Sequence, residues 1–296
     1  MFMKDTIVVT GGAGFVGSNL IKYFVSKTKL KIISIDNYSS GSIKNHIQNK
    51  RITYINGNTV NIKKLLKPFQ SKINAIFHFG EFSRIHQSFV NISDCISSNI
   101  SGTSEVFKFC LEKKIKIIYS ATSASLGNSG NDQYLSPYSF SKSKNLKFLI
   151  QLRKWFGLKY EILYFYNVYG KGHIQTGKMA TVIGIFEHQY LNKKPLTIVR
   201  PGTQSRKFTH IDDTVNGCYL AWKNNLNRHY SLSNNKSYSI KKIAEMFNTK
   251  VIFIKEKMGE RFKSSEVKMV NNEKIYKIPC KINIKNYIKT FIKISF

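Results

Sequence analysis

Short apolar runs alternate with longer amphipathic stretches over the first 170 residues of the chain. Runs rich in Val, Ile, Tyr and Phe predict strands that are buried on both faces of a parallel sheet. We predict such strands at 6–10, 30–36, 75–80, 116–121 and 160–168. The intervening stretches 16–27 and 93–113 carry apolar residues at helical spacing. Strands that alternate with amphipathic helices predict an α/β fold, a doubly wound parallel sheet of Rossmann type.

The pattern loosens after Gly170, which predicts a second part of different construction. We expect helices at 179–191, 212–223 and 239–247, a strand at 195–199, and a terminal helix from the Lys- and Ile-rich tail that starts at 281. The chain is therefore divided into residues 1–168 and residues 169–296. The second part is a smaller mixed α/β lobe whose strands can interleave with the first.

Composition narrows the class of protein. The chain has 296 residues and is 42% hydrophobic, which is enough to bury a sizeable core. We expect no membrane span and no signal peptide, because no apolar run is long enough and the first strand begins at residue 6. Four cysteines lie far apart, at Cys95, Cys110, Cys218 and Cys280. This usage favours a reduced, cytoplasmic protein without a metal site.

The net charge is unusually positive, with 47 Lys and Arg against 16 Asp and Glu and a formal charge of +31. Such a charge raises the local concentration of polyanions, so nucleic acid, anionic membrane and nucleotide substrates are all candidates. The lysines are spread along the whole chain with Ile and Asn and form no single block. We therefore favour a compositional bias over a dedicated binding surface.

The most specific stretch is TGGAGFVGSNL (10–20), which follows a predicted strand and opens a predicted helix. In this context Gly11 permits a tight turn, Gly14 permits close approach to a pyrophosphate, and Gly17 permits close packing of helix on sheet. The phosphates would lie at the helix N-terminus, where free N–H groups favour anions.

Asp36 ends the second predicted strand, 19 residues after Gly17. A carboxylate there accepts hydrogen bonds from the adenosine ribose and repels a 2′-phosphate, so it favours NAD over NADP. The alternative is an ordinary turn aspartate in DNYSSG.

The stretch SPYSFSK (136–142) places Tyr138 one helical turn before Lys142, on the same helix face. The same Tyr-x-x-x-Lys spacing recurs at Tyr23/Lys27, Tyr190/Lys194, Tyr219/Lys223 and Tyr238/Lys242. Spacing alone does not choose among these pairs.

Eight segments occur in a recognisable order: TGGAGFVGSNL, SIDNYSSG, AIFHFG, NISG, YSATSASLG, YSFSK, YFYNVYG and RKFTHIDD. In this order the chain resembles the extended short-chain dehydrogenase/reductase superfamily, and within it the NAD-dependent sugar-nucleotide epimerase/dehydratase family. The resemblance covers about residues 6–265. It implies an NAD-binding Rossmann domain at 1–168, which carries the catalytic helix, and a substrate-binding lobe at 169–296.

The resemblance selects Tyr138 and Lys142, because the family's pair follows the fourth strand and a Ser or Thr at that strand's end. Thr122 occupies the Ser/Thr position and would bond the sugar hydroxyl that is oxidised. A free phenol has a pKa near ~10. Lys142 and the positive nicotinamide ring would favour the phenolate. Tyr138 would then take the hydroxyl proton while hydride leaves the same carbon for NAD.

The resemblance also implies a wider set of contacts. Cofactor contacts are expected at Gly11, Gly14, Phe15, Val16, Gly17, Asp36, Asn37, Asn58, Thr59, Phe79, Gly80, Asn99, Tyr138, Lys142 and Tyr166. Substrate contacts are expected at Thr122, Asn167, Arg206, Lys257 and Ser264. Arg206 suits bidentate binding of a diphosphate. His78 and His210 are strand-end residues in this interpretation, and no metal site is expected.

Three positions depart from the family pattern. Asn58 replaces the usual Asp that contacts adenine, Lys207 replaces the usual Asp after the arginine, and the loop 127–138 is several residues shorter than is typical.

The triplet Thr122-Ser123-Ala124 favours one reaction over its relatives. Sugar-nucleotide dehydratases carry Asp and Glu after the Thr, and UDP-glucuronate decarboxylases keep the Glu, whereas this chain has Ser and Ala. We therefore expect a C4 epimerase of a UDP-hexose, and the small Ser264 would admit an N-acetyl group at C2. Lys257 would add charge to the diphosphate site.

Two alternatives stay open. An ADP-heptose 6-epimerase is favoured by the segment 164–180, although that family has a lysine where Thr176 falls. A catalytically silent dinucleotide-binding protein that binds RNA or regulates transcription is motivated by the charge of +31.

The resemblance also implies a homodimer. Helices near 93–113 and 139–155 from each subunit would form a four-helix interface. An apolar stripe for it is expected at Phe107, Cys110, Leu111, Leu146, Leu149 and Ile150.

Overall fold

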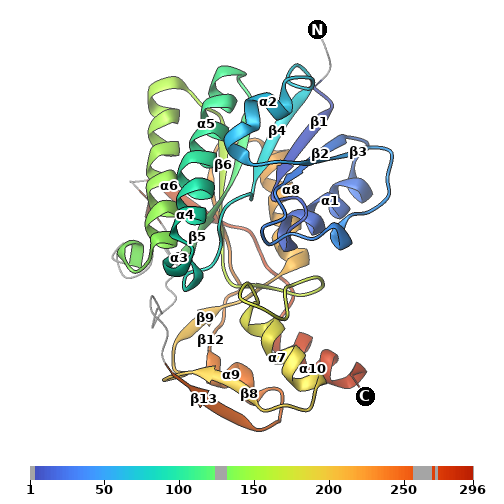
Figure 1. Cartoon of the computed structure of the whole chain (residues 1–296), viewed down its shortest axis with the longest axis vertical. Coiled ribbons are helices and arrows are strands. Elements are labelled where there is room, and N and C mark those ends of the chain that lie inside the picture. Colours follow the sequence, from blue (N-terminus) through green and yellow to red (C-terminus); the bar gives the residue numbers. More distant parts are fainter. Residues whose placement is uncertain (1–3, 124–131, 256–268, 271–272, 296) are drawn as a thin grey trace.

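The computed structural model describes residues 4–123, 132–255, 269–270 and 273–295. Its centre is a nine-stranded sheet in the order β14-β15-β11-β6-β5-β4-β1-β2-β3 (Figure 1). The strands are β1 (Thr6–Thr10), β2 (Lys31–Asp36), β3 (Ile52–Asn56), β4 (Ile73–His78), β5 (Lys116–Thr122), β6 (Tyr160–Phe165), β11 (His229–Leu232), β14 (Met269–Val270) and β15 (Glu273–Lys277). Eight of them run parallel, and β14 pairs antiparallel with β15.

The chain first runs outward from β1 to β3, then crosses back to β4 and continues outward the other way through β5 and β6. The strand order therefore reverses between β1 and β4. In a doubly wound sheet, ligands bind at the carboxyl ends of the strands beside this reversal. The predicted doubly wound parallel sheet is confirmed.

Helices cover both faces of the sheet. The helices that belong to these layers are α1 (Phe15–Lys27), α2 (Ile62–Leu66), α3 (Gln87–Val90), α4 (Ile92–Cys95), a π-helical segment η3 (Ile96–Gly102), α5 (Thr103–Glu112), α6 (Pro137–Phe156) and α8 (Ile211–Asn224). Val8 of β1 packs in the core beneath α5 and α6, whereas Ile7 and Val9 pack beneath α1 and α8. Alternation of side chains along a strand fills both layers.

Helix α6 carries the selected Tyr/Lys pair, and its start follows from local sequence. Ser136 caps the helix, since its hydroxyl accepts a hydrogen bond from the Ser139 N–H at 3.1 Å. Pro137 occupies the first turn, where its missing N–H costs nothing. Gly157 ends the helix with a φ of 70°. Tyr138 and Lys142 therefore lie in the first two turns, close to the carboxyl edge of the sheet.

A smaller lobe follows residue 168, shown below the sheet in Figure 1. Its elements are β7 (Val168–Tyr169), α7 (Val182–Leu191), β8 (Leu196–Val199), β9 (Ser205–Lys207), β10 (Thr209–His210), β12 (Ser237–Ser239), α9 (Ile240–Glu245), β13 (Val251–Ile254) and α10 (Ile284–Ile294). Two short helices, η1 (Ile43–Asn45) and η2 (Thr59–Asn61), belong to the first part of the chain. The lobe has its own core around Phe186, Phe208 and Phe247. Between these elements, α8, β11 and β15 return to the large sheet.

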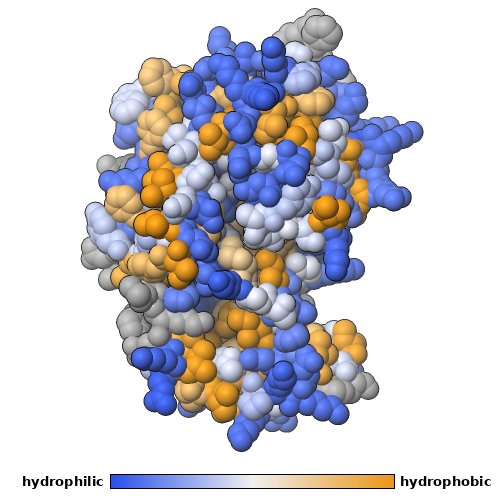
Figure 2. All heavy atoms as spheres, in the orientation of Figure 1, coloured by the Kyte–Doolittle hydropathy of each residue, from blue (hydrophilic) through white to orange (hydrophobic). Residues whose placement is uncertain are grey.

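The predicted interface stripe is wrong. Phe107, Cys110, Leu146, Leu149 and Ile150 are buried in the subunit's own core between α5, α6 and the sheet, and Leu111 packs against that core. The exposed apolar side chains of the same region are Val90, Ile92, Ile96, Ile100, Phe140, Phe148, Trp155 and Phe156. Figure 2 shows apolar side chains along the flank where α6 lies. Periodicity found the apolar positions but not the layer that each one faces.

Within the described residues, no helix is both long enough and apolar enough to cross a membrane.

Candidate active site

A cleft of about 880 Å³ lies where the carboxyl ends of the strands face the smaller lobe. It brings together most of the predicted site, with lining residues Gly11, Gly14, Phe15, Val16, Gly17, Asp36, Asn37, Asn58, Thr59, Phe79, Gly80, Thr122, Tyr138, Lys142, Asn167 and Arg206. These residues come from α1, β2, η2, β5, α6, the lobe and the loops that follow β1, β2, β3, β4 and β6. Residues far apart in the chain thus share one cavity.

Two predicted contacts lie elsewhere. Asn99 is fully buried behind the cleft wall: its side-chain oxygen accepts from Phe82 N–H at 2.6 Å, and its amide donates to Phe82 O at 3.1 Å and Ser141 Oγ at 3.0 Å. It therefore holds the chain after β4 and is not among the residues that line the cleft. Tyr166 is 1% exposed and belongs to the core under α5 and α6. Lys257 and Ser264 lie outside the described residues.

The glycine loop has the shape that a pyrophosphate requires. A Cβ on Gly11, whose φ is 70°, would come within 2.8 Å of the Phe79 backbone, and a Cβ on Gly17 would come within 2.1 Å of Gly11 O. These glycines let β1, β4 and α1 approach one another. Gly14 is different, because a Cβ there would meet only Gly11 O, at 3.2 Å. Its open side faces the cleft and leaves room for a phosphate at the start of α1.

Asp36 ends β2 and lines the same cleft. Its carboxylate accepts from Ala13 N–H at 2.9 Å and from Tyr38 N–H at 2.8 Å, and the residue is 8% exposed. These bonds fix the carboxylate beside the glycine loop. Asn37 donates to the side-chain oxygen of Asn58 at 2.6 Å, so this oxygen of Asn58 is already engaged by the protein. The role of Asp36 toward the ribose stays a prediction.

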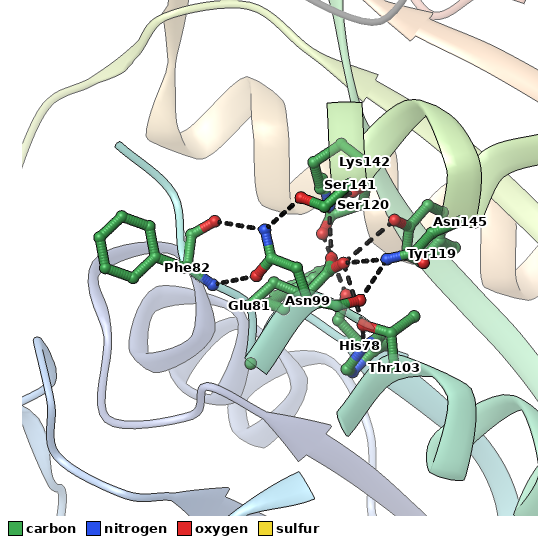
Figure 3. Close-up of polar contacts among 12 residues, drawn as sticks. His78, Glu81, Phe82, Asn99, Thr103, Tyr119, Ser120, Ser141, Lys142 and Asn145 are labelled. Carbon is green, nitrogen blue, oxygen red and sulfur yellow. Dashed lines mark hydrogen bonds and ion pairs between the residues drawn. The ribbon is translucent and has the colours of Figure 1, made fainter. Parts of the chain in front are cut away.

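Lys142, one of the three predicted catalytic residues, is held by several groups of the protein. Its side chain is 5% exposed, and its ammonium donates to the Glu81 carboxylate and to the Ser120 carbonyl of β5 (Figure 3). It also lies over the Tyr119 ring, 4.5 Å from the ring centroid. Two of its three N–H donors are thus bound to protein, which leaves one for the cleft.

Glu81 is a site residue that the sequence analysis missed. Its other oxygen, Oε1, accepts from Tyr119 OH at 3.1 Å, Thr103 Oγ1 at 3.0 Å and Asn145 Nδ2 at 3.1 Å. The carboxylate is 3% exposed and lines the cleft. The available signal was its position: an acid directly after the strand-end segment HFG stands at the ligand-binding edge of a parallel sheet.

The network extends to the start of the glycine loop through His78. The His78 ring contacts Thr10 Oγ1 at 2.7 Å and Thr103 Oγ1 at 3.0 Å. Burial lowers the pKa of His78 to about 4, so its ring is neutral at pH 7. Burial also raises the pKa of Tyr119 well above its ordinary value. Both groups therefore act as uncharged hydrogen-bonding partners.

Cations line the other wall of the cleft. Arg84 follows β4, and its guanidinium donates to Met179 O at 2.9 and 2.6 Å, which ties the first part to the lobe. Burial lowers the pKa of Arg84 from its ordinary value. Arg206 and Lys178 also line the cleft. Such a wall suits an anionic substrate. No cluster of His, Cys, Asp and Glu that could hold a metal occurs among the described residues.

Comparison with known proteins agrees with this geometry. Residues 7–233 match the family model described as the NAD dependent epimerase/dehydratase family. The UDP-glucose epimerase YtcB of Bacillus subtilis, itself uncharacterized, is 31% identical over 71% of this chain and 70% of its own length. The ADP-L-glycero-D-manno-heptose-6-epimerase of Brachyspira hyodysenteriae is 31% identical over 71% of this chain and 69% of its own length.

Two solved structures share the fold. The UDP-glucose 4-epimerase of Thermotoga maritima, solved with UDP-glucose, superposes with a TM-score of 0.83 at 20% identity over 97% of both chains. The UDP-N-acetylglucosamine 4-epimerase of Methanobrevibacter ruminantium has a TM-score of 0.82 at 24% identity, over 99% of this chain and 98% of its own.

Proposed function

The chain belongs to the NAD dependent epimerase/dehydratase family, and we propose that it inverts C4 of a UDP-hexose or UDP-N-acetylhexosamine. One observation carries the proposal: Thr122, Tyr138 and Lys142 line the same cleft as the glycine loop. A hydroxyl, a phenol and an ammonium beside a dinucleotide site are the groups that reversible oxidation of a sugar hydroxyl needs.

The cofactor of the family is NAD, and the residues present fit it. Gly11, Gly14 and Gly17 would hold the pyrophosphate of NAD, and Asp36 would bind its adenosine ribose. Phe79 and Gly80 would line the part of the cofactor that lies beyond the pyrophosphate. When bound, NAD supplies the acceptor and donor of hydride at the substrate carbon.

The protein's own residues transfer the C4 hydroxyl proton and orient the sugar. Thr122 Oγ1 forms a hydrogen bond with the C4 oxygen and holds this oxygen toward Tyr138. The phenolate of Tyr138, stabilised by the Lys142 cation, takes the C4 hydroxyl proton while the hydrogen on C4 leaves as hydride, and the sugar becomes a 4-keto sugar. The ketose turns in the cleft, Tyr138 returns the proton to the oxygen, and hydrogen returns to the opposite face of C4. The reaction is redox-neutral because the same hydrogen leaves and returns.

The carboxylate beside Lys142 is poorly suited to the competing eliminations. Glu81 is the one carboxylate among the described residues that contact Lys142, and its two oxygens are engaged by Lys142, Tyr119, Thr103 and Asn145. A carboxylate held this way is not available as an elimination base. Ala124, where the resemblance expects a glutamate in dehydratases, lies outside the described residues.

The nucleotide and sugar assignments rest on charge and size. Arg206 is 7% exposed, lines the lobe side of the cleft and would bind the diphosphate by two N–H groups. Lys257 would add a second positive charge there. Ser264 would leave room for an N-acetyl group at C2. Ser264→Tyr should depress activity on UDP-N-acetylhexosamines far more than on UDP-galactose, and equal effects on both would show that Ser264 does not face the sugar.

One observation favours the second candidate, an ADP-heptose 6-epimerase. Lys178 lines the cleft two residues after Thr176, where that family has a lysine. Lys178 could serve as a second base on the sugar's far side. Lys178→Met should abolish turnover if this candidate is correct and should leave a UDP-hexose 4-epimerase largely active.

A silent RNA-binding protein is the candidate from another class, and an intact Thr122/Tyr138/Lys142 set argues against it. A mobility shift of RNA at physiological salt, without any turnover of sugar nucleotides, would favour it.

A homodimer is part of the proposal, now through the exposed apolar side chains near α4 and α6. A monomeric mass by light scattering at micromolar concentration would contradict it. A cytoplasmic location is likewise proposed, since the dispersed cysteines suit a reducing compartment.

The test of the function is a substrate panel. The NAD-loaded protein is incubated with UDP-, GDP- and ADP-sugars, and products are identified by NMR. We expect interconversion of C4 epimers of a UDP-hexose. Turnover of ADP-heptoses alone would favour the second candidate.

A further inference from the structure

Arg84 is a cation of the cleft that no carboxylate balances. It follows β4, is partly buried and lines the cleft. Among the described residues, the acids that line the cleft are Asp36, Glu81 and Asp94, and none of them forms an ion pair with Arg84. Burial lowers the pKa of its guanidinium from the ordinary value, and no carboxylate opposes this shift. A charge in such a place costs free energy unless an opposite charge compensates it. The balancing anion is therefore expected from a ligand.

The guanidinium also keeps donors free for that ligand. Its Nε and Nη2 donate to Met179 O at 2.9 and 2.6 Å, and its Nη1 donates to Ser83 O at 3.1 Å. An arginine has five N–H donors. One N–H of Nη1 and one N–H of Nη2 are thus without a partner in the part of the chain that the structure describes. These two neighbouring nitrogens can bind both oxygens of one carboxylate.

Backbone contacts place Arg84 beside the residues proposed to act on the sugar. The Arg84 carbonyl accepts the Ser88 N–H at 3.1 Å, and Ser88 Oγ accepts the Tyr138 N–H at 3.2 Å. Arg84 therefore lies one residue away from the first turn of α6, where the proposed base stands. Arg206, the proposed ligand of the diphosphate, comes instead from β9 of the lobe. An anion that binds Arg84 is accordingly expected on the sugar.

A second cation stands on the same wall. Lys178 directly precedes Met179 in the chain, is exposed and lines the cleft. The charge of Lys142 is different, because Glu81 pairs with it. A substrate that fills the cleft displaces the water that solvates Arg84 and Lys178. A neutral sugar would leave these cations without a counter-charge, whereas a sugar carboxylate supplies one.

We propose that Arg84 binds a carboxylate on the sugar, so that the preferred substrate is a nucleotide hexuronate, with its carboxylate at C6, and not a neutral hexose. The inference rests on the proposed function in taking this cleft as the nucleotide-sugar site, and it narrows the sugar. C6 takes no part in the exchange of hydrogen at C4, so Thr122, Tyr138 and Lys142 keep their roles. A carboxylate at C6 is compatible with either a hydroxyl or an N-acetyl group at C2.

The experiment compares UDP-sugars that differ only at C6. The NAD-loaded protein is titrated by calorimetry with UDP-xylose, which has no C6, with UDP-glucose, and with UDP-glucuronate; UDP alone reports the nucleotide part. UDP-glucuronate should bind about 10–100-fold more tightly than UDP-glucose, the usual gain from hydrogen bonds to a charged group. UDP-xylose should bind about as UDP-glucose does. Equal affinities for the three sugars would overturn the inference without any variant, and would leave the C4 chemistry untouched.

Replacement of Arg84 assigns the preference to its side chain. Arg84→Gln removes the charge and should bring the ratio of the affinities for UDP-glucuronate and UDP-glucose close to one. Arg84→Lys keeps the charge but not the two-pronged geometry, and it should retain a smaller preference. If Arg84→Gln instead weakens UDP by the same factor as UDP-glucuronate, the guanidinium binds the diphosphate and the inference is wrong.

Arg51 offers a matched control. Its guanidinium also donates only to backbone carbonyls, those of Val25, Thr28 and Leu30, and it does not line the cleft. Arg51→Gln should leave the ratio of affinities unchanged. An equal fall of the ratio in Arg51→Gln and Arg84→Gln would reflect a loosened fold and would overturn the inference.

The substrate panel separates this inference from the proposed function. Turnover of neutral UDP-hexoses without a preference that depends on Arg84 would refute the inference and leave the proposed function standing. A preference that depends on Arg84, without exchange at C4, would support the inference and refute the proposed reaction. Failure of UDP and all three UDP-sugars to bind would contradict both.

Discussion

Two buried lysine–glutamate pairs stand on the two edges of one sheet. Lys116 and Glu161 begin β5 and β6 at the amino edge, and their side chains are 9% and 0% exposed. Lys142 and Glu81 meet beside the carboxyl end of β5, at 5% and 3% exposure. The chemistry and burial of the pairs are nearly equal. What differs is the edge, because in a doubly wound sheet only the carboxyl edge faces a ligand.

The partners of each pair reflect that difference. Glu161 accepts the N–H groups of Asn227 and Arg228, both at 2.9 Å, and Lys116 donates to Asn225 at 2.8 Å. All these bonds hold the turn between α8 and β11 on the sheet. Lys142 and Glu81 instead line the cleft together with Tyr138. The pair at the amino edge holds a turn on the sheet, whereas the pair at the carboxyl edge lines the candidate active site.

Removing the phenol should have the largest effect. Tyr138→Phe deletes the proposed base and should lower kcat by about 10²–10⁴-fold, the usual contribution of positioned acid–base catalysis. Bound NAD should remain, as measured by cofactor released on denaturation. Tyr190, which also precedes a lysine by four residues, packs in the core of the lobe. Tyr190→Phe should keep most activity, and full activity in Tyr138→Phe would refute the mechanism.

Replacing the lysine of each pair should affect different quantities: kcat at the carboxyl edge and the free energy of unfolding at the amino edge. Lys142→Met should reduce kcat by about 10²-fold or more and weaken NAD binding. Lys116→Met should leave the kcat of the folded fraction near that of wild type but lower the free energy of unfolding by about 3–5 kcal/mol, because Glu161 is left buried and unpaired. Denaturant titration and initial rates measure both. A kcat loss in Lys116→Met equal to that in Lys142→Met would erase the distinction between the edges.

Acid should weaken the fold through the carboxyl edge. Burial lowers the pKa of His78 from 6.5 to about 4, so the unfolded chain binds a proton more readily than the folded one. The stability contributed by neutral His78 is present above pH 6.5 and is lost as the pH falls toward 4, by about 3 kcal/mol in total. Unfolding of wild type and His78→Gln, compared from pH 7 to 4, should show a shallower decline in the variant. Parallel declines would exclude His78 as the source.

The smallest expected effect is on the preference for NAD over NADP. It is tested with two aspartates at opposite ends of the β1–β2 pair. Asp36 ends β2 in the cleft, whereas Asp5, 3.2 Å from Lys31, lies at the start of the same strand pair. Asp36→Ala should reduce the preference for NAD over NADP by about tenfold, which corresponds to ~1.4 kcal/mol. Asp5→Ala should leave it unchanged. Equal affinities of wild type for NAD and NADP would show that Asp36 does not read the ribose.

Local context made the cofactor loop predictable, because a glycine fingerprint between a strand and a helix is written in consecutive residues. Tyr138 and Lys142 were selected among five equally spaced pairs by the resemblance to a known family. Asn99 and Glu81 were not predictable in this way. The π-helical segment changes the register of the chain between α4 and α5, and it turns Asn99 inward to the Phe82 backbone. The role of Glu81 depends on four partners that come from three elements, α5, β5 and α6.

The same limit explains the misplaced interface. Helix α6 carries apolar residues both toward the sheet, as at Leu146 and Leu149, and toward solvent, as at Phe148 and Trp155. The sequence shows that both sets exist. Only packing against α5 and the sheet decides which set is buried.

The central claim is that the hydrogen removed from C4 returns to C4 while Tyr138 handles only the hydroxyl proton. The most direct measurement is epimerisation of an unlabelled UDP-hexose by the NAD-loaded protein in D₂O, with the product examined by NMR. The account predicts a C4 epimer that carries no deuterium on carbon. Deuterium at C4 or at a neighbouring carbon would mean that a proton is removed from carbon, and it would contradict the account.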